Sequence, residues 1–196
     1  MQLGTASSVV PFATENFAGR ECYRPAYDRV ADALCAVLDF RSAMDVGCAQ
    51  GFLIDGLLAR GVEAYGIEME RAALEYASPQ AAERISVGDA LRANPTTLFG
   101  LVCCIEVAEH IEPGKSQALV GRLCAMANSE VFFTAASPFQ PGHGHINCRP
   151  ATDWIHLFHA YGWRLDIDTT MELRARIGVN EAAPWIGMNT MLFVKE

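Results

Sequence analysis

The sequence lacks the segments that direct a chain into a membrane or out of the cell. No apolar run approaches the roughly 20 residues needed to cross a bilayer. The first residues, MQLGTASSVVPFATENF, have neither the basic start nor the apolar block of a signal peptide. The seven cysteines are scattered and include no C-x-x-C pair, so neither a zinc site nor a disulfide framework is indicated. We therefore expect a cytoplasmic chain with reduced cysteines and no membrane contact.

Positive charge is also scarce. The 196 residues include 15 Lys and Arg against 23 Asp and Glu, a formal net charge of −8, and no basic cluster stands out. Proteins that grip polyanions usually present a basic face, so we expect no nucleic-acid partner. A hydrophobic fraction of 51% supports a sizeable core, and the length fits a single domain over residues 1–196.

Hydrophobic patterning predicts strands that alternate with helices. We expect strands over residues 42–46, 63–68, 84–88, 100–105, 130–135, 163–170 and 187–195, with helices over residues 25–38, 52–59, 71–77, 119–126 and 154–161. This alternation predicts an α/β fold with a doubly wound, Rossmann-like, seven-stranded and mostly parallel sheet, with helices on both faces. Ligands bind such sheets outside the carboxyl ends of the strands.

A glycine turn between the first predicted strand and helix is the strongest local signal. In the segment Asp45–Leu53, DVGCAQGFL, Gly47 and Gly51 permit positive φ angles, and the amides of the following helix face an anionic group. We expect a side chain at Gly47 to enter the ligand's space and leave the fold largely intact. Counting from Gly47, the nicotinamide fingerprint G-x-G-x-x-G fails, because Ala49 and Phe52 occupy its later glycine positions. A P-loop also fails, since no lysine follows.

The D-x-G-x-x-x-G pattern resembles motif I of the class I S-adenosylmethionine-dependent methyltransferases, which usually have glycine where Ala49 stands. This resemblance implies that Glu68, with Glu70 near enough to compete, accepts hydrogen bonds from the ribose hydroxyls. It also implies that Asp89 contacts the adenine and that Glu106, in LVCCIEVAEHI, lies beside the methionine moiety. The cofactor-binding residues expected on this resemblance are Asp45, Gly47, Ala49, Gly51, Phe52, Glu68, Met69, Asp89, Ala90 and Glu106.

Three histidines are the candidate catalytic residues. His110 follows the fourth predicted strand, where a general base could reach the acceptor, although it could instead cap the next turn. His143 and His145 lie in the 136–150 loop, which is long enough to act as a lid or to be a plain surface loop. We expect residues 1–40 to form a lead-in and a helix over the site, and the resemblance implies that Tyr23 and Tyr27 could close over the acceptor.

The resemblance implies a methyltransferase acting on a small molecule, with a hydroxyl oxygen as the favoured acceptor atom, and GHGHINCRPATDWIHLF is loosely similar to natural-product tailoring enzymes. Two alternatives stay open. Glu106-x-x-Glu109-His110 with His145 resembles the divalent-metal site of small-RNA 2′-O-methyltransferases, but a similar run occurs in ubiquinone-biosynthesis O-methyltransferases. We therefore assign no metal ligand and leave metal binding open. The other alternative is a non-catalytic domain that only binds the cofactor.

Overall fold

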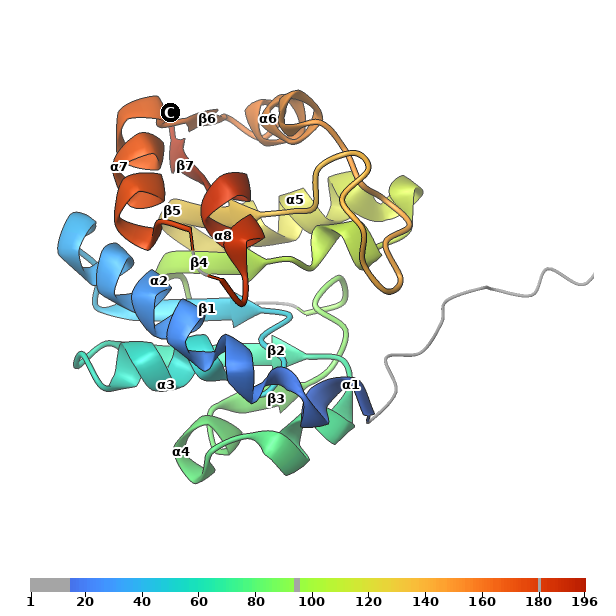
Figure 1. The fold of residues 1–196 in the computed structure, drawn as a ribbon. Coiled ribbons are helices and arrows are strands. Elements are labelled where there is room, and N and C mark those ends of the chain that lie inside the picture. Colours follow the sequence, from blue (N-terminus) through green and yellow to red (C-terminus); the bar gives the residue numbers. More distant parts are fainter. Residues whose placement is uncertain (1–14, 94–95, 180) are drawn as a thin grey trace, which may run out of the picture.

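The fold is built on one twisted sheet (Figure 1). The computed structural model describes residues 15–93, 96–179 and 181–196. Within these ranges, the sheet has seven strands in the order β3-β2-β1-β4-β5-β7-β6. The strands are β1 Ser42–Val46, β2 Glu63–Glu68, β3 Ile85–Val87, β4 Phe99–Ile105, β5 Ala127–Thr134, β6 Trp163–Leu165 and β7 Met191–Lys195. Strands β1 to β5 are parallel, and β7 runs antiparallel to both β5 and β6. The predicted doubly wound, mostly parallel sheet is confirmed.

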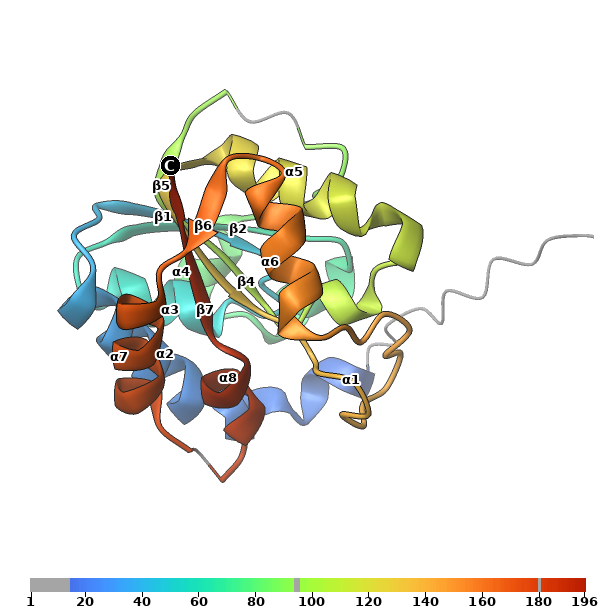
Figure 2. The ribbon, with the colours of Figure 1, turned by 90° about the horizontal axis from the view of Figure 1, so that it is seen from above.

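Helices cover both faces of the sheet, as predicted. The α-helices are α1 Glu15–Ala18, α2 Arg24–Val37, α3 Phe52–Leu58, α4 Pro79–Ala82, α5 Ser116–Met126, α6 Ala151–His159, α7 Ile167–Ile177 and α8 Pro184–Asn189. The 3₁₀ turns are η1 Arg20–Tyr23, η2 Arg71–Tyr76, η3 Ala108–His110 and η4 Pro113–Lys115. In Figure 2, α2, α3 and α7 lie on one face, whereas α5 and α6 lie on the other. Within the described ranges, no helix is both long and apolar enough to cross a membrane.

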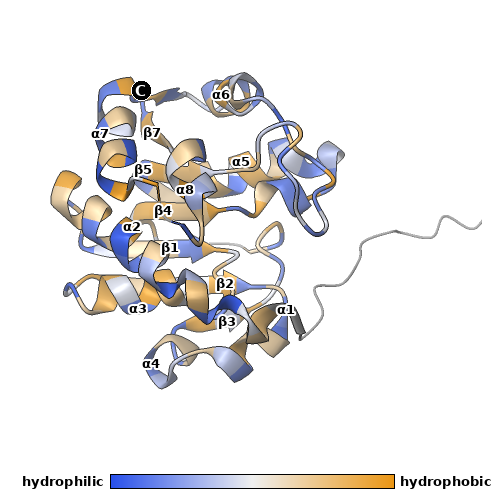
Figure 3. Cartoon of the chain, viewed as in Figure 1, coloured by the Kyte–Doolittle hydropathy of each residue, from blue (hydrophilic) through white to orange (hydrophobic). Residues whose placement is uncertain are grey.

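The buried core forms two layers, one on each face of the sheet. Helix α2 places Val30, Ala31 and Leu34 against α3 and the sheet, which explains its apolar stripe. On the opposite face, Trp154 and Phe158 of α6 pack against β5 and β7. Figure 3 shows that the central strands are apolar, as expected for strands covered on both faces. This burial fixes the strand ends that carry the polar residues discussed below.

Several predicted boundaries were wrong for identifiable reasons. The predicted strand 163–170 ends at Leu165, because the Asp166 side chain accepts a hydrogen bond from the Thr169 amide (3.3 Å) and caps α7. The predicted strand 187–195 begins only at Met191, since residues 187–189 finish α8. The predicted helix 71–77 is a 3₁₀ turn. The chain then continues into α4, for which Ser78 is the N-cap, rather than stopping there. Residues 1–14 of the irregular lead-in lie outside the described residues, and 15–18 are helical.

Candidate active site

The glycine turn after β1 has the backbone conformation that its sequence predicts. Gly47 and Gly51 have φ angles of +77° and +79°, and Ala49 shares the left-handed region at +47°. Glycine is favoured at position 49 because a Cβ makes this conformation costly. At Gly47 an added Cβ would lie 2.4 Å from Cγ2 of Val107, so it would meet protein before any ligand. The expectation that a side chain there would leave the fold intact is therefore wrong.

Glu68, at the end of β2, holds this turn in place. Its Oε2 accepts a hydrogen bond from the Ala49 amide (2.8 Å), and its Oε1 accepts one from the Glu70 amide (2.9 Å). The residue is 9% exposed, so both bonds are largely shielded from water. Hydrogen bonds of backbone N–H groups to a carboxylate are stronger than neutral ones. Glu68 thus connects the ends of β1 and β2.

A first cavity opens at these strand ends, and most of the predicted cofactor residues line it. They are Gly47, Ala49, Glu68, Met69, Asp89, Ala90 and Glu106. The Asp89 carboxylate forms part of the wall and accepts a hydrogen bond from the Leu91 amide (2.9 Å), which fixes its orientation. The first cavity therefore brings together residues from the ends of four strands, as the sheet topology predicted.

Asp45, Gly51 and Phe52 do not line the first cavity. Asp45 is 4% exposed, and burial, followed by the nearby Glu68 charge, raises the pKa of its carboxyl to about 7. Gly51 serves as the N-cap of α3, and a Cβ there would lie 2.8 Å from Ala81. Phe52 packs under the Arg24 guanidinium in the helix layer. These three predicted cofactor-binding residues therefore lie outside the lining of the first cavity.

A second cavity of about 530 Å³ adjoins the first. Its walls include Tyr23 and Tyr27 together with Trp185 of α8. The three candidate histidines, His110, His143 and His145, also line it. The two cavities share the residues Arg20, Gly47, Glu106 and His110. A group held in the first cavity can therefore meet a molecule in the second only beside these residues.

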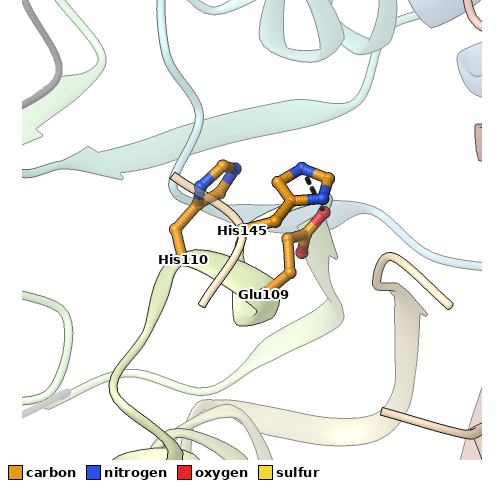
Figure 4. A group of neighbouring side chains, drawn as sticks. All are labelled: Glu109, His110 and His145. Atoms are coloured by element: carbon orange, nitrogen blue, oxygen red, sulfur yellow. Dashed lines mark ion pairs between the residues drawn. The ribbon is translucent and has the colours of Figure 1, made fainter. Parts of the chain in front are cut away.

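Glu109, His110 and His145 converge at the wall of the second cavity (Figure 4). One ligand atom from each residue lies within 4.8 Å of the others. His110 Nδ1 lies 3.2 Å from the Gly144 carbonyl, and His145 Nδ1 lies 3.2 Å from the Gln140 carbonyl. A carbonyl oxygen only accepts hydrogen bonds, so each Nδ1 carries a proton, and in the neutral form of either ring the lone pair is on Nε2. Burial lowers the pKa of His110 to about 4, which keeps its ring neutral.

Glu109 is the least solvated acid of this group. It is 0% exposed, and neither carboxylate oxygen has a partner with good hydrogen-bond geometry within the described part of the chain, although the backbone amides of Glu109 and Ala136 and the Glu106 carboxyl lie nearby. Burial and the nearby Glu106 charge raise the pKa of Glu109 to about 8. The Nε2 of His145 is 4.0 Å from Oε1 of Glu109. An unsatisfied buried carboxyl group is costly and calls for a proton or a cation.

Residues that the sequence did not single out complete the walls. Arg20 comes from η1, Gln140 from the 136–150 loop, and Trp185 and Ile186 from α8. Pro184 stands at the first turn of α8, where proline is favoured, and this signal could have revealed the helix. Nothing in the local sequence shows that α8 reaches the end of β4, which lies more than 80 residues earlier in the chain.

The fold and the sequence both match known methyltransferases. The family model described as "Methyltransferase domain" matches residues 44–124. The ubiquinone biosynthesis O-methyltransferase of Alkalilimnicola ehrlichii is 34% identical over 116 residues, which is 55% of this chain and 46% of that protein. The magnesium protoporphyrin IX methyltransferase of Synechocystis PCC 6803, solved with bound SAH, superposes over 100% of this chain and 90% of its own with a TM-score of 0.67 and 14% identity. The amino pentose methyltransferase of Micromonospora echinaspora superposes over 100% of both chains, with a TM-score of 0.66 and 15% identity.

These findings define the class. Residues 44–124 match the methyltransferase domain family, and the fold is that of the class I S-adenosylmethionine-dependent methyltransferases, as the glycine turn and the strand-end acids predicted. The chain spans about half the length of the curated relatives that it matches. The curated relatives are ubiquinone biosynthesis O-methyltransferases, proteins named for building a small molecule.

Proposed function

We propose that this chain binds S-adenosylmethionine in the first cavity and methylates a hydroxyl group of a small molecule held in the second. The observation that carries this proposal is the meeting of the two cavities at Gly47, Glu106 and His110. Methyl transfer from a sulfonium is an in-line displacement, so the enzyme contributes mainly by aligning donor and acceptor. Two adjoining cavities with shared walls provide such an alignment.

The first cavity offers groups suited to each part of the cofactor. In this proposal, Glu68 accepts hydrogen bonds from the ribose hydroxyls, and Asp89 accepts one from the adenine amino group. The backbone at Gly47 and Ala49 approaches closely because neither residue carries a large side chain. S-adenosylmethionine, when bound, supplies the electrophilic methyl group. These assignments follow the family's motif order, and the position of each residue on the cavity wall supports them.

His110 is the proposed base for the acceptor hydroxyl. Its ring is neutral near pH 7, and the hydrogen bond to the Gly144 carbonyl leaves Nε2 as the basic nitrogen. A base with a pKa of about 4 is a weak acceptor for an alcohol proton, because proton transfer is most effective near the operating pH. The proposed reaction therefore needs either an acidic hydroxyl or a second group that lowers the hydroxyl pKa.

A divalent cation is the second group that we favour, because of the unsatisfied buried carboxylate of Glu109. His145 Nε2, 4.0 Å from Oε1 of Glu109, would supply a lone pair to the same cation, and a backbone carbonyl orients the His145 ring, as is usual for metal-binding histidines. A cation held by Glu109 and His145 would lower the pKa of a coordinated hydroxyl, and Nε2 of His110 would accept the proton that this hydroxyl loses. Glu106 already accepts amide hydrogen bonds on both oxygens, so we leave it out of the ligand set.

A methyl-transfer screen over small hydroxylated compounds tests this proposal. Release of S-adenosylhomocysteine is measured with Mg²⁺ and with EDTA, for the wild type and for His110→Ala, with exposed His156→Ala as the matched control. We expect His110→Ala to lose most of the rate and His156→Ala to lose none. Loss of turnover in EDTA and its return with Mg²⁺ would support the metal. Activity of His110→Ala equal to that of the wild type would exclude His110 as the base.

The same screen includes a short RNA with a free 3′ end. The net charge of −8 and the small second cavity favour a small molecule over RNA. Turnover on the RNA alone, with a steep dependence on salt, would contradict the small-molecule assignment. Cofactor binding without turnover on any acceptor would favour the non-catalytic alternative.

A further inference from the structure

Glu106 is held by two amide side chains that come from distant parts of the chain. Its Oε2 accepts a hydrogen bond from Nε2 of Gln140 (3.1 Å), and its Oε1 accepts one from Nδ2 of Asn189 (3.1 Å). The same Asn189 nitrogen also donates to Oε1 of Gln140 (3.0 Å). These three residues form a closed triangle, which we call the Glu106 clamp. It joins the end of β4 to the 136–150 loop and to α8.

The backbone of Glu106 is fixed as firmly as its side chain. The residue has a φ of +53°, which non-glycine residues adopt rarely and which must be enforced by the surroundings. Its amide donates to Thr134, both to the hydroxyl (3.0 Å) and to the carbonyl (3.2 Å). Conformations of this kind concentrate at functional sites. The clamp therefore holds one carboxylate in one place at considerable structural cost.

We propose that Gln140 and Asn189 are positioning residues that hold the Glu106 carboxylate at the junction of the two cavities, so that the chain favours the sulfonium cofactor over its neutral thioether product. This inference rests on the proposed function. Each carboxylate oxygen accepts one amide N–H, so the triangle fixes the orientation of the Glu106 side chain. Glu106 lines both cavities, and the transferable methyl must cross from one to the other there.

The charge difference between cofactor and product makes this position selective. S-adenosylmethionine carries a positive sulfur, whereas S-adenosylhomocysteine has a neutral sulfur and is otherwise the same apart from the methyl group. A carboxylate close to a partly buried cation changes affinity by roughly tenfold or more. Arg20 and Glu109 also face this junction or its wall, but the two amide donors of the clamp point to Glu106. The clamp thus fixes the orientation of a carboxylate at the junction through which the methyl group would pass.

Calorimetric titration of the chain with each compound tests the inference. The quantity compared is the ratio of the Kd for S-adenosylhomocysteine to the Kd for S-adenosylmethionine. We expect Glu106→Gln to lower this ratio roughly tenfold. Asn189→Leu, which removes one amide donor, should lower it in the same direction by less. Met188→Ala, a change at the neighbouring exposed residue of α8, should leave the ratio unchanged.

A charge-swapped variant separates electrostatics from packing. Glu106→Gln combined with Asn189→Asp keeps an amide facing a carboxylate but moves the negative charge to α8. We expect Asn189→Asp alone to lower the melting temperature and the double variant to restore it. The ratio of the Kd for S-adenosylhomocysteine to the Kd for S-adenosylmethionine should nevertheless remain different from that of the wild type. Binding of both compounds with an unchanged ratio in Glu106→Gln and Asn189→Leu would overturn this inference alone. Failure of the folded wild type to bind either compound would overturn the proposed function with it.

Discussion

Replacing Gly47 by alanine should destabilise the fold by about 2–4 kcal/mol, the sum of two separable effects. The first is the left-handed backbone, at a φ of +77°, which costs an alanine about 1 kcal/mol. The second is steric. The new Cβ would lie 2.4 Å from Cγ2 and 3.0 Å from Cγ1 of Val107, and relieving such overpacking typically costs about 1–3 kcal/mol.

Gly61 provides a matched control for the backbone effect. It has the same φ of +77°, but an added Cβ would meet nothing within 4 Å. Gly61→Ala should therefore cost about 1 kcal/mol, and the reduction in unfolded-state freedom is common to both variants. Urea unfolding at constant m-value measures both costs. The difference between the two variants is the steric contribution of Val107.

A double variant tests the assignment to Val107 directly. Val107→Ala removes both methyl groups that the new Cβ would meet, so Gly47→Ala should cost only about 1 kcal/mol in that background. If Gly47→Ala lowers the free energy of unfolding by no more than Gly61→Ala does, Val107 makes no steric contribution. The same conclusion follows if Gly47→Ala lowers it equally in the Val107→Ala background and in the wild type.

Two further predictions concern the same turn. Asp45→Asn should stabilise the chain by about 4 kcal/mol at pH 8.5 and by little near pH 4. The raised pKa of Asp45 means that its protonated form stabilises the fold at low pH, and this stability is lost as the pH rises from about 4 through 7. Urea unfolding at several pH values measures this gain, and a difference independent of pH would contradict it. Ala49→Gly should change stability by less than about 1 kcal/mol, because relief at a φ of +47° opposes the greater freedom of the unfolded glycine. Calorimetry should show unchanged affinity for S-adenosylmethionine, and weaker binding would mean that the Ala49 Cβ contacts the ligand.

Local chemistry made the first half of the chain predictable. Only glycine takes positive φ at little cost, so the spacing of Gly47 and Gly51 is enough to predict the turn. The apolar run at 100–105 is typical of a strand buried on both faces, and β4 is that strand. The acids Glu68 and Asp89 follow strands that end at one edge of the sheet, so topology alone brought them to one cavity.

The C-terminal part was less predictable because tertiary contacts decide it. Residues 163–170 contain apolar and β-branched side chains that suit a strand, yet the Asp166 cap turns the chain into α7. The bond between Asn189 and Glu106 spans 83 residues, and no local pattern announces such a contact. The burial of Glu109 likewise depends on the loop that folds over it, through the Ile146 and Asn147 amides that donate to its carbonyl.

Calorimetric titration of S-adenosylmethionine into the wild type and Glu68→Gln tests the central claim most directly. We expect one binding site for S-adenosylmethionine in the wild type. In Glu68→Gln the affinity for S-adenosylmethionine should be roughly tenfold weaker, because the neutral amide gives up charge-assisted hydrogen bonds. Circular dichroism of both proteins would confirm that each is folded. A folded wild-type chain that takes up no S-adenosylmethionine would contradict the account.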